Sequence, residues 1–208
     1  MTASDEAVRA ISAADPELAE VIARSGPLPA RPGLGDPFTS LAHAIVFQQL
    51  AGRAAAAIYG RVEEAIGGAM TAAALLATAP EQLRAAGLSN AKLLALTDLA
   101  TRTADGRLEL DHFDQAADDQ IVERLVAVRG IGRWTAEMFL LFELRRTDVW
   151  PVDDLGVRAG YSLIHALPET IKPRALQAAG ERYRPYRSTV ALYCWHAVHV
   201  SRGTSPVR

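Results

Sequence analysis

The chain has 208 residues, of which 50% are hydrophobic, so it can bury one sizeable core or two small helical lobes but not more than two domains. Its formal net charge of −2 at pH 7 argues against a protein coated in positive charge. Its single cysteine, Cys194, excludes internal disulfides, four-cysteine iron–sulfur clusters and zinc sites built from several thiolates.

The charge is unevenly distributed along the chain. Residues 1–120 carry 9 Lys and Arg against 16 Asp and Glu, whereas residues 121–208 carry 13 against 8. If the protein binds DNA, the C-terminal portion should make most of the contacts, although two ordinary solvated surfaces would give the same counts. The acidic first twenty residues, and the lack of the roughly 18 consecutive apolar residues of a membrane helix, predict a soluble, cytoplasmic and nucleoid-associated protein.

Helix signals are dense and period-2 alternation is almost absent, which predicts an all-α fold. Asp36 followed by Pro37 is typical of an N-cap and a first helical position. Thr78 and Glu81 have the spacing of a capping box, in which a hydroxyl and a carboxylate satisfy each other's free backbone donors. Helices are predicted, in chain order, over residues 36–50, 53–66, 79–86, 89–100, 118–129, 133–144, 154–166, 173–179 and 186–200.

The few prolines and glycines fall between the predicted helices, so the lobes should be built from interleaved segments rather than joined by a tether. Residues 38–148 are expected to form a six-helix lobe. Residues 1–37 together with 149–208 are expected to form a second helical lobe.

The stretch Val128-Arg129-Gly130-Ile131-Gly132 lies between two apolar helices. Its glycines permit backbone conformations that side chains forbid, which predicts a tight hairpin over residues 128–132. Backbone N–H groups at the start of the second helix can approach a phosphate there, aided by the helix dipole, and would bind DNA without sequence preference. A simple turn between packed helices would leave the same two glycines, so the glycines alone do not decide between the two interpretations.

The sequence from Leu125 to Tyr161, LVAVRGIGRWTAEMFLLFELRRTDVWPVDDLGVRAGY, resembles the helix-hairpin-helix DNA glycosylase superfamily, and most closely its 3-methyladenine DNA glycosylase II branch. The similarity extends over residues 38–200, with further matching segments at residues 44–50, 87–92 and 184–195. It implies two helical lobes with the active site in the cleft between them.

The resemblance implies roles for individual residues. Asp154 matches the family's catalytic aspartate, with the adjacent Asp153 as the alternative. Candidates for the pocket that holds the base are the aromatic residues Trp134, Trp195, Phe47 and Tyr186. For Phe47 and Tyr186, packing in the core is the alternative. Candidates for contacts with DNA lie in the hairpin and in an earlier turn that would wedge into the duplex: Gly130, Ile131, Gly132, Arg133, Thr135, Gln49 and Leu50.

The expected reaction is hydrolysis of the N-glycosidic bond of an alkylated purine such as 3-methyladenine or 7-methylguanine. A carboxylate would stabilise the positive sugar that forms, and aromatic faces would attract the cationic base. Trp134 stands where strand-nicking members of the superfamily have a lysine, so no Schiff base can form and a monofunctional enzyme is implied. The same fold acting on uracil, oxidised or etheno bases, and a non-catalytic DNA-binding scaffold, remain alternatives.

The expected partner is double-stranded DNA with damaged bases, bound by a monomer without any membrane contact. No cofactor or transition-metal site is predicted, because His196 and His199 are three residues apart without a third ligand. A sodium or potassium ion held by backbone carbonyls of the hairpin is compatible with the resemblance.

Overall fold

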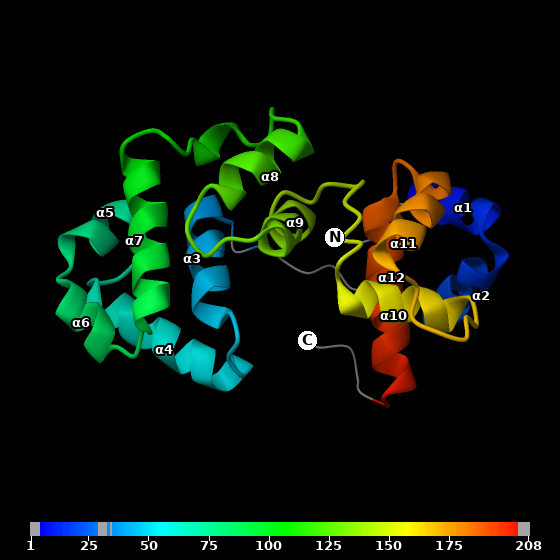
Figure 1. Cartoon of the computed structure of the whole chain (residues 1–208), viewed down its shortest axis with the longest axis horizontal. Coiled ribbons are helices and arrows are strands. Elements are labelled where there is room, and N and C mark those ends of the chain that lie inside the picture. Colours follow the sequence, from blue (N-terminus) through cyan, green and yellow to red (C-terminus); the bar gives the residue numbers. More distant parts are fainter. Residues whose placement is uncertain (1–4, 29–32, 34, 204–208) are drawn as a thin grey trace. The chain divides into compact units, whose positions relative to one another are not determined.

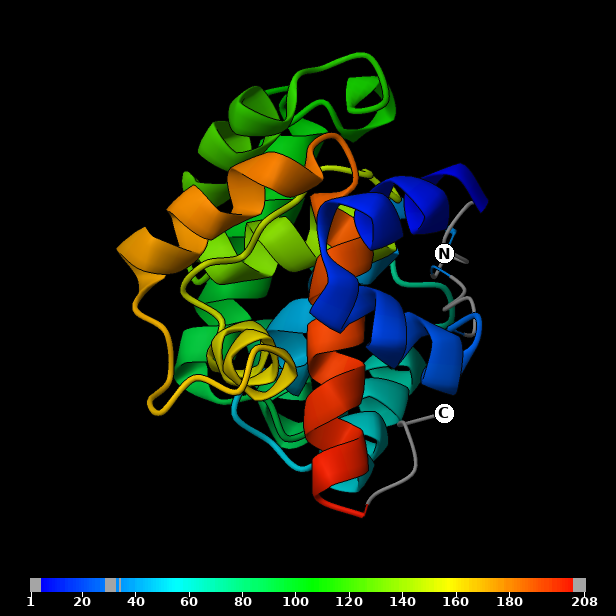
Figure 2. The ribbon, with the colours of Figure 1, turned by 90° about the vertical axis from the view of Figure 1, so that its right-hand side faces the viewer.

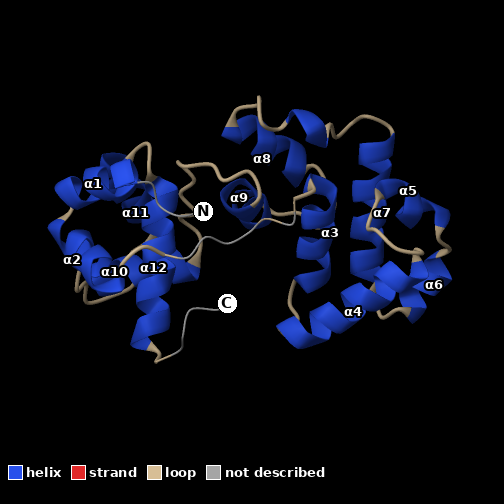
Figure 3. Ribbon diagram, turned by 180° about the vertical axis from the view of Figure 1, so that it is seen from behind, coloured by secondary structure: helices blue, strands red, loops and turns tan. Residues whose placement is uncertain are grey.

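The computed structural model describes residues 5–28, 33 and 35–203. These residues form helices and loops without a strand (Figure 3), which confirms the predicted all-α class. None of the helices described there is long and apolar enough to cross a membrane. The helices in chain order (Figure 1) are α1 Asp5–Ala14, α2 Pro16–Ser25, α3 Pro37–Phe47, α4 Gly52–Ala65, α5 Ala72–Ala77, α6 Pro80–Ala85, α7 Asn90–Ala104, the 3₁₀ helix η1 Leu110–His112, α8 Asp118–Val126, α9 Arg133–Phe142, α10 Leu155–Ile164, α11 Pro173–Gly180, the 3₁₀ helix η2 Glu181–Tyr183 and α12 Arg187–Ser201.

The chain divides into two compact units. Unit 1 comprises Met1–Arg31 with Arg145–Arg208, and unit 2 comprises Pro32–Leu144. The boundaries predicted from the sequence lie at residues 37/38 and 148/149. Residues 1–4, 29–32, 34 and 204–208 of the predicted second lobe lie outside the described residues. Six helices are predicted for the other lobe, whereas unit 2 has the seven α-helices α3 to α9 in its described part. The additional helix is α5, whose first turn is capped by the Thr71 hydroxyl.

Unit 2 is organised around α3, which contacts α4, α7 and α9. The helix begins as predicted, because the Asp36 carboxylate accepts a hydrogen bond of 2.7 Å from the backbone N–H of Thr39. Leu41 and Ile45, four residues apart on one face, are completely buried. The centre of α3 is therefore held rigidly, and its last turn projects from a fixed support.

The capping box predicted at Thr78 and Glu81 is wrong. Pro80 occupies the first turn of α6, so Ala79 becomes the N-cap and has no side-chain acceptor to offer. Thr78 instead ends α5, and its hydroxyl donates to the carbonyl of Ala74 at 2.8 Å. Two short helices separated by the two residues Thr78 and Ala79 thus replace the one helix start that the pattern indicated.

Unit 1 is organised around α12, which contacts α10, α1 and α2 (Figure 2). The closest approach is at Gly160 of α10, where a Cβ atom would lie 2.0 Å from the backbone carbonyl oxygen of Cys194 in α12. Only glycine permits this distance between the two helices. Helices α1 and α2 are not among those predicted from the sequence, although both carry acidic residues in their first turns.

Asp15, the N-cap of α2, is completely buried and joins α2 to the end of α10 and to η2. Its carboxylate accepts hydrogen bonds from the backbone N–H of Leu18 at 3.0 Å and from the hydroxyl of Tyr183, and it pairs with Arg182 at 2.6 Å and His165 at 2.9 Å. Burial alone would raise the pKa of Asp15, but the hydrogen bonds from Tyr183, Leu18 and His165 outweigh it and lower the pKa to about 2. Asp15 is therefore a structural anion.

Candidate active site

Asp154 is the N-cap of α10 in unit 1. Its Oδ1 accepts two hydrogen bonds, one from the backbone N–H of Val157 at 2.7 Å and one from the indole Nε1 of Trp195 at 2.8 Å. The positive end of the α10 dipole favours a negative charge at this position. Asp154 is half-buried, whereas its neighbour Asp153 is exposed. The structure therefore brings together two of the predicted site residues, Asp154 and Trp195, and gives the carboxylate a fixed orientation.

The loop that leads to Asp154 is fastened to the start of α12, the helix that carries Trp195. The buried guanidinium of Arg187 makes hydrogen bonds of 2.7 and 2.9 Å to the two carboxylate oxygens of Asp148. The hydroxyl of the next residue, Ser188, bonds two backbone groups of the same loop at 2.6 and 2.9 Å. These bonds thus link the loop before Asp154 to α12, the helix that carries Trp195.

Gly156 explains how the indole can lie so close to the carboxylate. A Cβ atom on Gly156 would be 2.6 Å from Cδ1 and 2.8 Å from Nε1 of Trp195. Any side chain there would displace the indole from Asp154. The local motif does not reveal this role of Gly156, because it depends on Trp195, a residue far along the chain.

The hairpin, residues 128–132, joins α8 and α9 in unit 2. Gly130 has φ +78°, and a Cβ atom there would lie 3.0 Å from the Cβ of Ala95, so this position requires glycine. Gly132 does not need glycine for its conformation: its φ is −90°, and an added Cβ would meet nothing within 4 Å. At Gly132 the missing side chain leaves open space beside the start of α9. Ile131 is buried, with an exposed fraction of 3%, so its side chain packs into the interior of unit 2 rather than against a ligand.

The first turn of α9 is the part of the hairpin motif with the most exposed side chains. Its N-cap, Gly132, supplies no side-chain acceptor for the backbone N–H groups of that turn. Trp134 is 50% exposed, and Arg133 points an exposed guanidinium toward Glu137, which it pairs with at 3.0 Å. Thr135 is buried. This turn has the features of an anion-binding helix start with a large aromatic side chain beside it.

The wedge turn, residues 48–50, follows α3 in unit 2. The predicted helix should continue to about Leu50, but α3 ends at Phe47, because Gln48 leaves the helical region and Gln49 has φ +57°. Gln49 is exposed, and Leu50 is 39% exposed. The amide Nε2 of Gln48 donates to the carbonyl of Gly130 in the hairpin at 3.0 Å. The turn and the hairpin, far apart in sequence, are therefore in direct contact.

Phe47 belongs to an aromatic cluster of unit 2. Its ring stacks on His43 with 3.7 Å between ring centroids, and the ring of Tyr59 packs edge-on against both. Burial lowers the pKa of His43 and, with the nearby charges of Glu63 and Asp36, raises the pKa of Tyr59 to about 12. The Tyr59 hydroxyl is buried and has no hydrogen-bond partner within the described residues. No local sequence pattern indicates that His43 and Tyr59 lie beside Phe47.

Tyr186 is not brought to Asp154 and Trp195. It is the N-cap residue of α12 and precedes Trp195 by nine residues, which is about 13 Å along a helix. Its hydroxyl hydrogen-bonds to Glu6, and this bond raises the pKa of Tyr186. Tyr186 therefore packs at the other end of α12, and of the candidate pocket residues in unit 1 only Trp195 touches Asp154.

Within the described residues, one group has potential metal-ligand atoms within 4.8 Å of one another: Asp15, Glu17 and His165. Arg182 already supplies a positive charge 2.6 Å from the Asp15 carboxylate, so we interpret this group as an ion-pair cluster. In the hairpin, the Gly130 carbonyl accepts a hydrogen bond from Gln48 at 3.0 Å.

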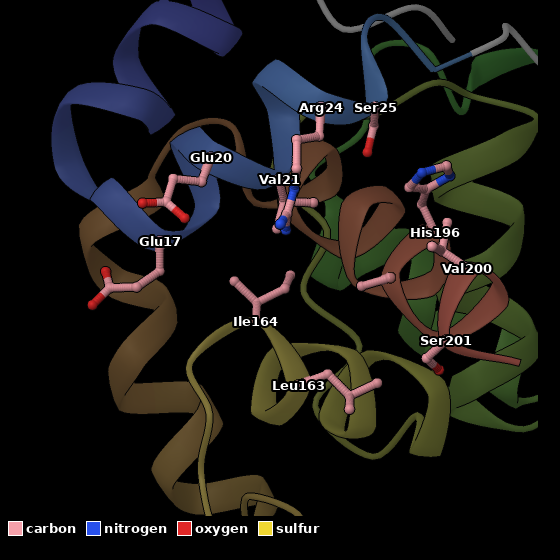
Figure 4. A pocket seen from close by; sticks show the side chains of 11 residues that line it. Glu17, Glu20, Val21, Arg24, Ser25, Leu163, Ile164, His196, Val200 and Ser201 are labelled. Carbon is pink, nitrogen blue, oxygen red and sulfur yellow. The ribbon is translucent and has the colours of Figure 1, made fainter.

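Unit 1 also contains a cavity of about 600 Å³ between α2, α10 and α12 (Figure 4). Apolar side chains such as Ile164 and Leu163 line it together with Glu17, Glu20 and Arg24 at its polar side. Neither Asp154 nor Trp195 is among the lining residues. This cavity is thus separate from the predicted site.

The fold and these motifs define a helix-hairpin-helix protein with an aspartate N-cap paired to an indole. Residues 42–185 match the family described as HhH-GPD superfamily base excision DNA repair protein. The chain belongs to this superfamily.

Known relatives agree with this assignment. A DNA-3-methyladenine glycosidase structure from Bacillus halodurans is 34% identical with a TM-score of 0.90, and the match covers 98% of this chain and 94% of that one. A Schizosaccharomyces pombe 3-methyladenine DNA glycosylase in complex with abasic DNA is 31% identical with a TM-score of 0.79 over 95% and 97% of the two chains. The resemblance to the 3-methyladenine branch is thereby confirmed.

Sequence comparison gives the same result. The S. pombe DNA-3-methyladenine glycosylase 1 is 34% identical over 176 residues, which are 83% of this chain and 77% of the relative. Other curated relatives are longer, and the chain spans only 41% and 47% of the length of two of them.

Proposed function

We propose that this protein is a DNA glycosylase that hydrolyses the N-glycosidic bond of alkylated purines in double-stranded DNA, as the first step of base excision repair. The observation that carries the proposal is the Asp154 carboxylate, oriented by the N–H of Val157 and the indole of Trp195. The names of the relatives, 3-methyladenine DNA glycosylases and a glycosidase, support the choice of substrate class.

The proposed chemistry needs one carboxylate. Cleavage of the glycosidic bond leaves a sugar with oxocarbenium character, and the negative charge of Asp154 stabilises it and orients the attacking water. A purine that is alkylated on a ring nitrogen already carries positive charge and leaves readily without a general acid. The base must be turned out of the duplex before the carboxylate can reach the anomeric carbon.

Recognition of the cationic base is assigned to aromatic faces. A cation above an indole gains about 0.5–2 kcal/mol, which favours an alkylated purine over its neutral counterpart. Within unit 1 we assign this contact to Trp195, whose indole bonds Asp154. Trp134, which is 50% exposed at the start of α9 in unit 2, is proposed as a second contact on the basis of the family resemblance. Tyr186 is withdrawn from the predicted pocket residues because it packs at the opposite end of α12.

The test is release of free bases from methylated genomic DNA by the purified protein, with each base identified by its mass. We expect 3-methyladenine and 7-methylguanine to appear. Duplexes that contain uracil, an oxidised base or an etheno adduct are assayed in parallel. Release from only one of these duplexes would change the assigned substrate class but not the assigned reaction. No release from any DNA would overturn the proposed function.

We further propose that the enzyme is monofunctional and of the glycosylase II type. Trp134 occupies the second residue of α9, where the strand-nicking members of the superfamily carry a lysine, and an indole cannot form a Schiff base with the sugar. Incubation with damaged DNA and borohydride should therefore leave no covalent protein–DNA adduct, whereas a lysine-bearing glycosylase treated identically is trapped. An adduct with this protein would contradict the proposal.

We also propose a monomer that works in the cytoplasm on nucleoid DNA, without an organic cofactor. A sodium or potassium ion at the hairpin would be held by backbone carbonyls, and it would reinforce the local attraction for phosphate.

A further inference from the structure

The wedge turn has a conformation that its own residues do not favour. Gln49 has φ +57°, a region in which residues other than glycine are disfavoured by contact of the Cβ with the backbone. Such a residue persists only where the surroundings hold it. Within the turn the backbone bond from Leu50 N to the Phe47 carbonyl is long, at 3.4 Å. The support for this turn therefore has to come from elsewhere in unit 2.

Lys92, at the start of α7, supplies the first support. Its ammonium donates to the backbone carbonyl of Val46 at 2.6 Å, in the last turn of α3 where carbonyls have no later N–H of the helix to accept from. Ser89 caps α7 and accepts the backbone N–H of Lys92, which fixes the residue at the helix start. Lys92 is half-buried, and burial lowers its pKa. Its charge is thus directed at the helix end rather than at solvent.

Gln48 supplies the second support and links the turn to the hairpin. Its amide Nε2 donates to the Gly130 carbonyl at 3.0 Å and lies 3.5 Å from the hydroxyl of Thr135 in α9. Gly130 is the hairpin residue with positive φ, so its carbonyl direction is set by the hairpin conformation. A single side chain therefore connects the residue before Gln49 to the backbone predicted to grip phosphate.

The hairpin is held from its other side by α7. The Asp98 carboxylate accepts the backbone N–H of Arg129 at 2.8 Å and the guanidinium of Arg102 at 2.9 Å. The Cβ of Ala95, one turn earlier in α7, lies against Gly130. Thus α7 supports both elements: Lys92 bonds the end of α3, and Asp98 bonds the hairpin. Gln48 in turn links the wedge turn directly to the hairpin.

We propose that Gln48 and Lys92 are positioning residues that hold the wedge turn at a fixed place relative to the hairpin. The inference rests on the proposed function. The hairpin determines where the DNA backbone lies, and the wedge turn determines where a side chain enters the gap left by the extruded nucleotide. If the two elements are rigidly linked, the wedge meets the gap without a further adjustment, and the flipped state is stabilised.

The test compares an undamaged duplex with a duplex that contains a tetrahydrofuran abasic analogue. Gln48→Met keeps the length of the side chain and removes its donor. We expect its affinity for the abasic duplex to fall about tenfold while its affinity for undamaged DNA changes less than twofold, because Asp98 still holds the hairpin. Gln82→Met, on the exposed side of α6, is the matched control and should change neither affinity.

A double-mutant cycle separates positioning from general damage to the fold. If Gln48 acts through the wedge turn, Gln48→Met added to Leu50→Ala should cause no further loss beyond that of Leu50→Ala alone. Lys92→Met should behave like Gln48→Met, and Lys92→Arg, which retains a donor, should restore affinity for the abasic duplex. The melting temperatures of the variants are measured alongside.

Equal losses of affinity for both duplexes, additive losses of affinity in the double-mutant cycle, or no loss of affinity would each overturn the positioning role. Base release by the wild-type protein would still uphold the proposed function. A wild-type protein that releases bases but has equal affinity for the two duplexes would overturn this inference alone. A wild-type protein that releases no base from any DNA would overturn the proposed function, and this inference with it.

Discussion

Replacing Asp154 by asparagine should lower the rate of base release by about 100-fold or more and leave DNA binding nearly unchanged. Asparagine has the same shape, remains a good N-cap, and its oxygen can still accept the hydrogen bonds from Val157 and Trp195. The substitution therefore removes the negative charge and little else. The rate is measured in single-turnover release from methylated DNA, and binding is measured by fluorescence anisotropy on a tetrahydrofuran duplex.

Asp153→Asn is the matched control for this prediction. Asp153 is the adjacent carboxylate, it is exposed, and it was the alternative assignment from the sequence. We expect its substitution to change base release less than threefold. If Asp153→Asn abolished release and Asp154→Asn did not, the catalytic role would belong to Asp153. If both variants released bases at the wild-type rate, a carboxylate mechanism at this loop would be excluded.

Replacing Gly160 by alanine should destabilise the protein by about 3 kcal/mol, the upper end of the effects of overpacking, because the new Cβ would lie 2.0 Å from the Cys194 carbonyl oxygen. A backbone atom cannot rotate away as a side chain can. Relief requires α10 to move away from α12, and this movement also separates Asp154 from Trp195. Thermal unfolding followed by circular dichroism should show a decrease of the melting temperature by about 10 °C.

Gly60→Ala provides the control with the same chemical change. Gly60 lies inside α4, and a Cβ atom there would meet nothing within 4 Å. Alanine is the better helix former, so this variant should be more stable than wild type by about 0.5–1 kcal/mol. We therefore expect the change in the free energy of unfolding to have opposite signs in Gly160→Ala and Gly60→Ala. If Gly160→Ala had the same melting temperature as the wild type, α10 and α12 would not be packed as closely as described.

Much of the fold could be predicted from local signals. Asp36 and Ser89 cap helices through bonds to residues three positions later, and such short-range interactions are visible in the sequence. Competition between local signals produced the errors. Pro80 outweighed the Thr78 capping pattern, and the continuous apolar run after Asp36 concealed the end of α3 at Phe47. The acidic residues of α1 and α2 argue against a leader peptide, and neither helix is among those predicted from the sequence.

The candidate site was predictable in its parts but not in its geometry. Spacing within a motif identified the hairpin and Asp154, because both depend on residues close together in the chain. It could not show that Trp195 bonds Asp154 across 41 positions, or that Gln48 bonds Gly130 across 82. It also grouped Tyr186 with Trp195, although a helix separates them by about 13 Å.

The sequence by itself determined the helical class, the superfamily resemblance and the residue proposed to carry the catalytic charge, since each depends on a local sequence pattern. Only the tertiary structure decided which glycines are needed for close packing, which aromatic residue touches the carboxylate, and that the wedge turn and hairpin are joined. The physical reason is that hydrogen bonds form over about 3 Å, and distances on that scale between remote segments follow from the packing of helices rather than from their order in the chain.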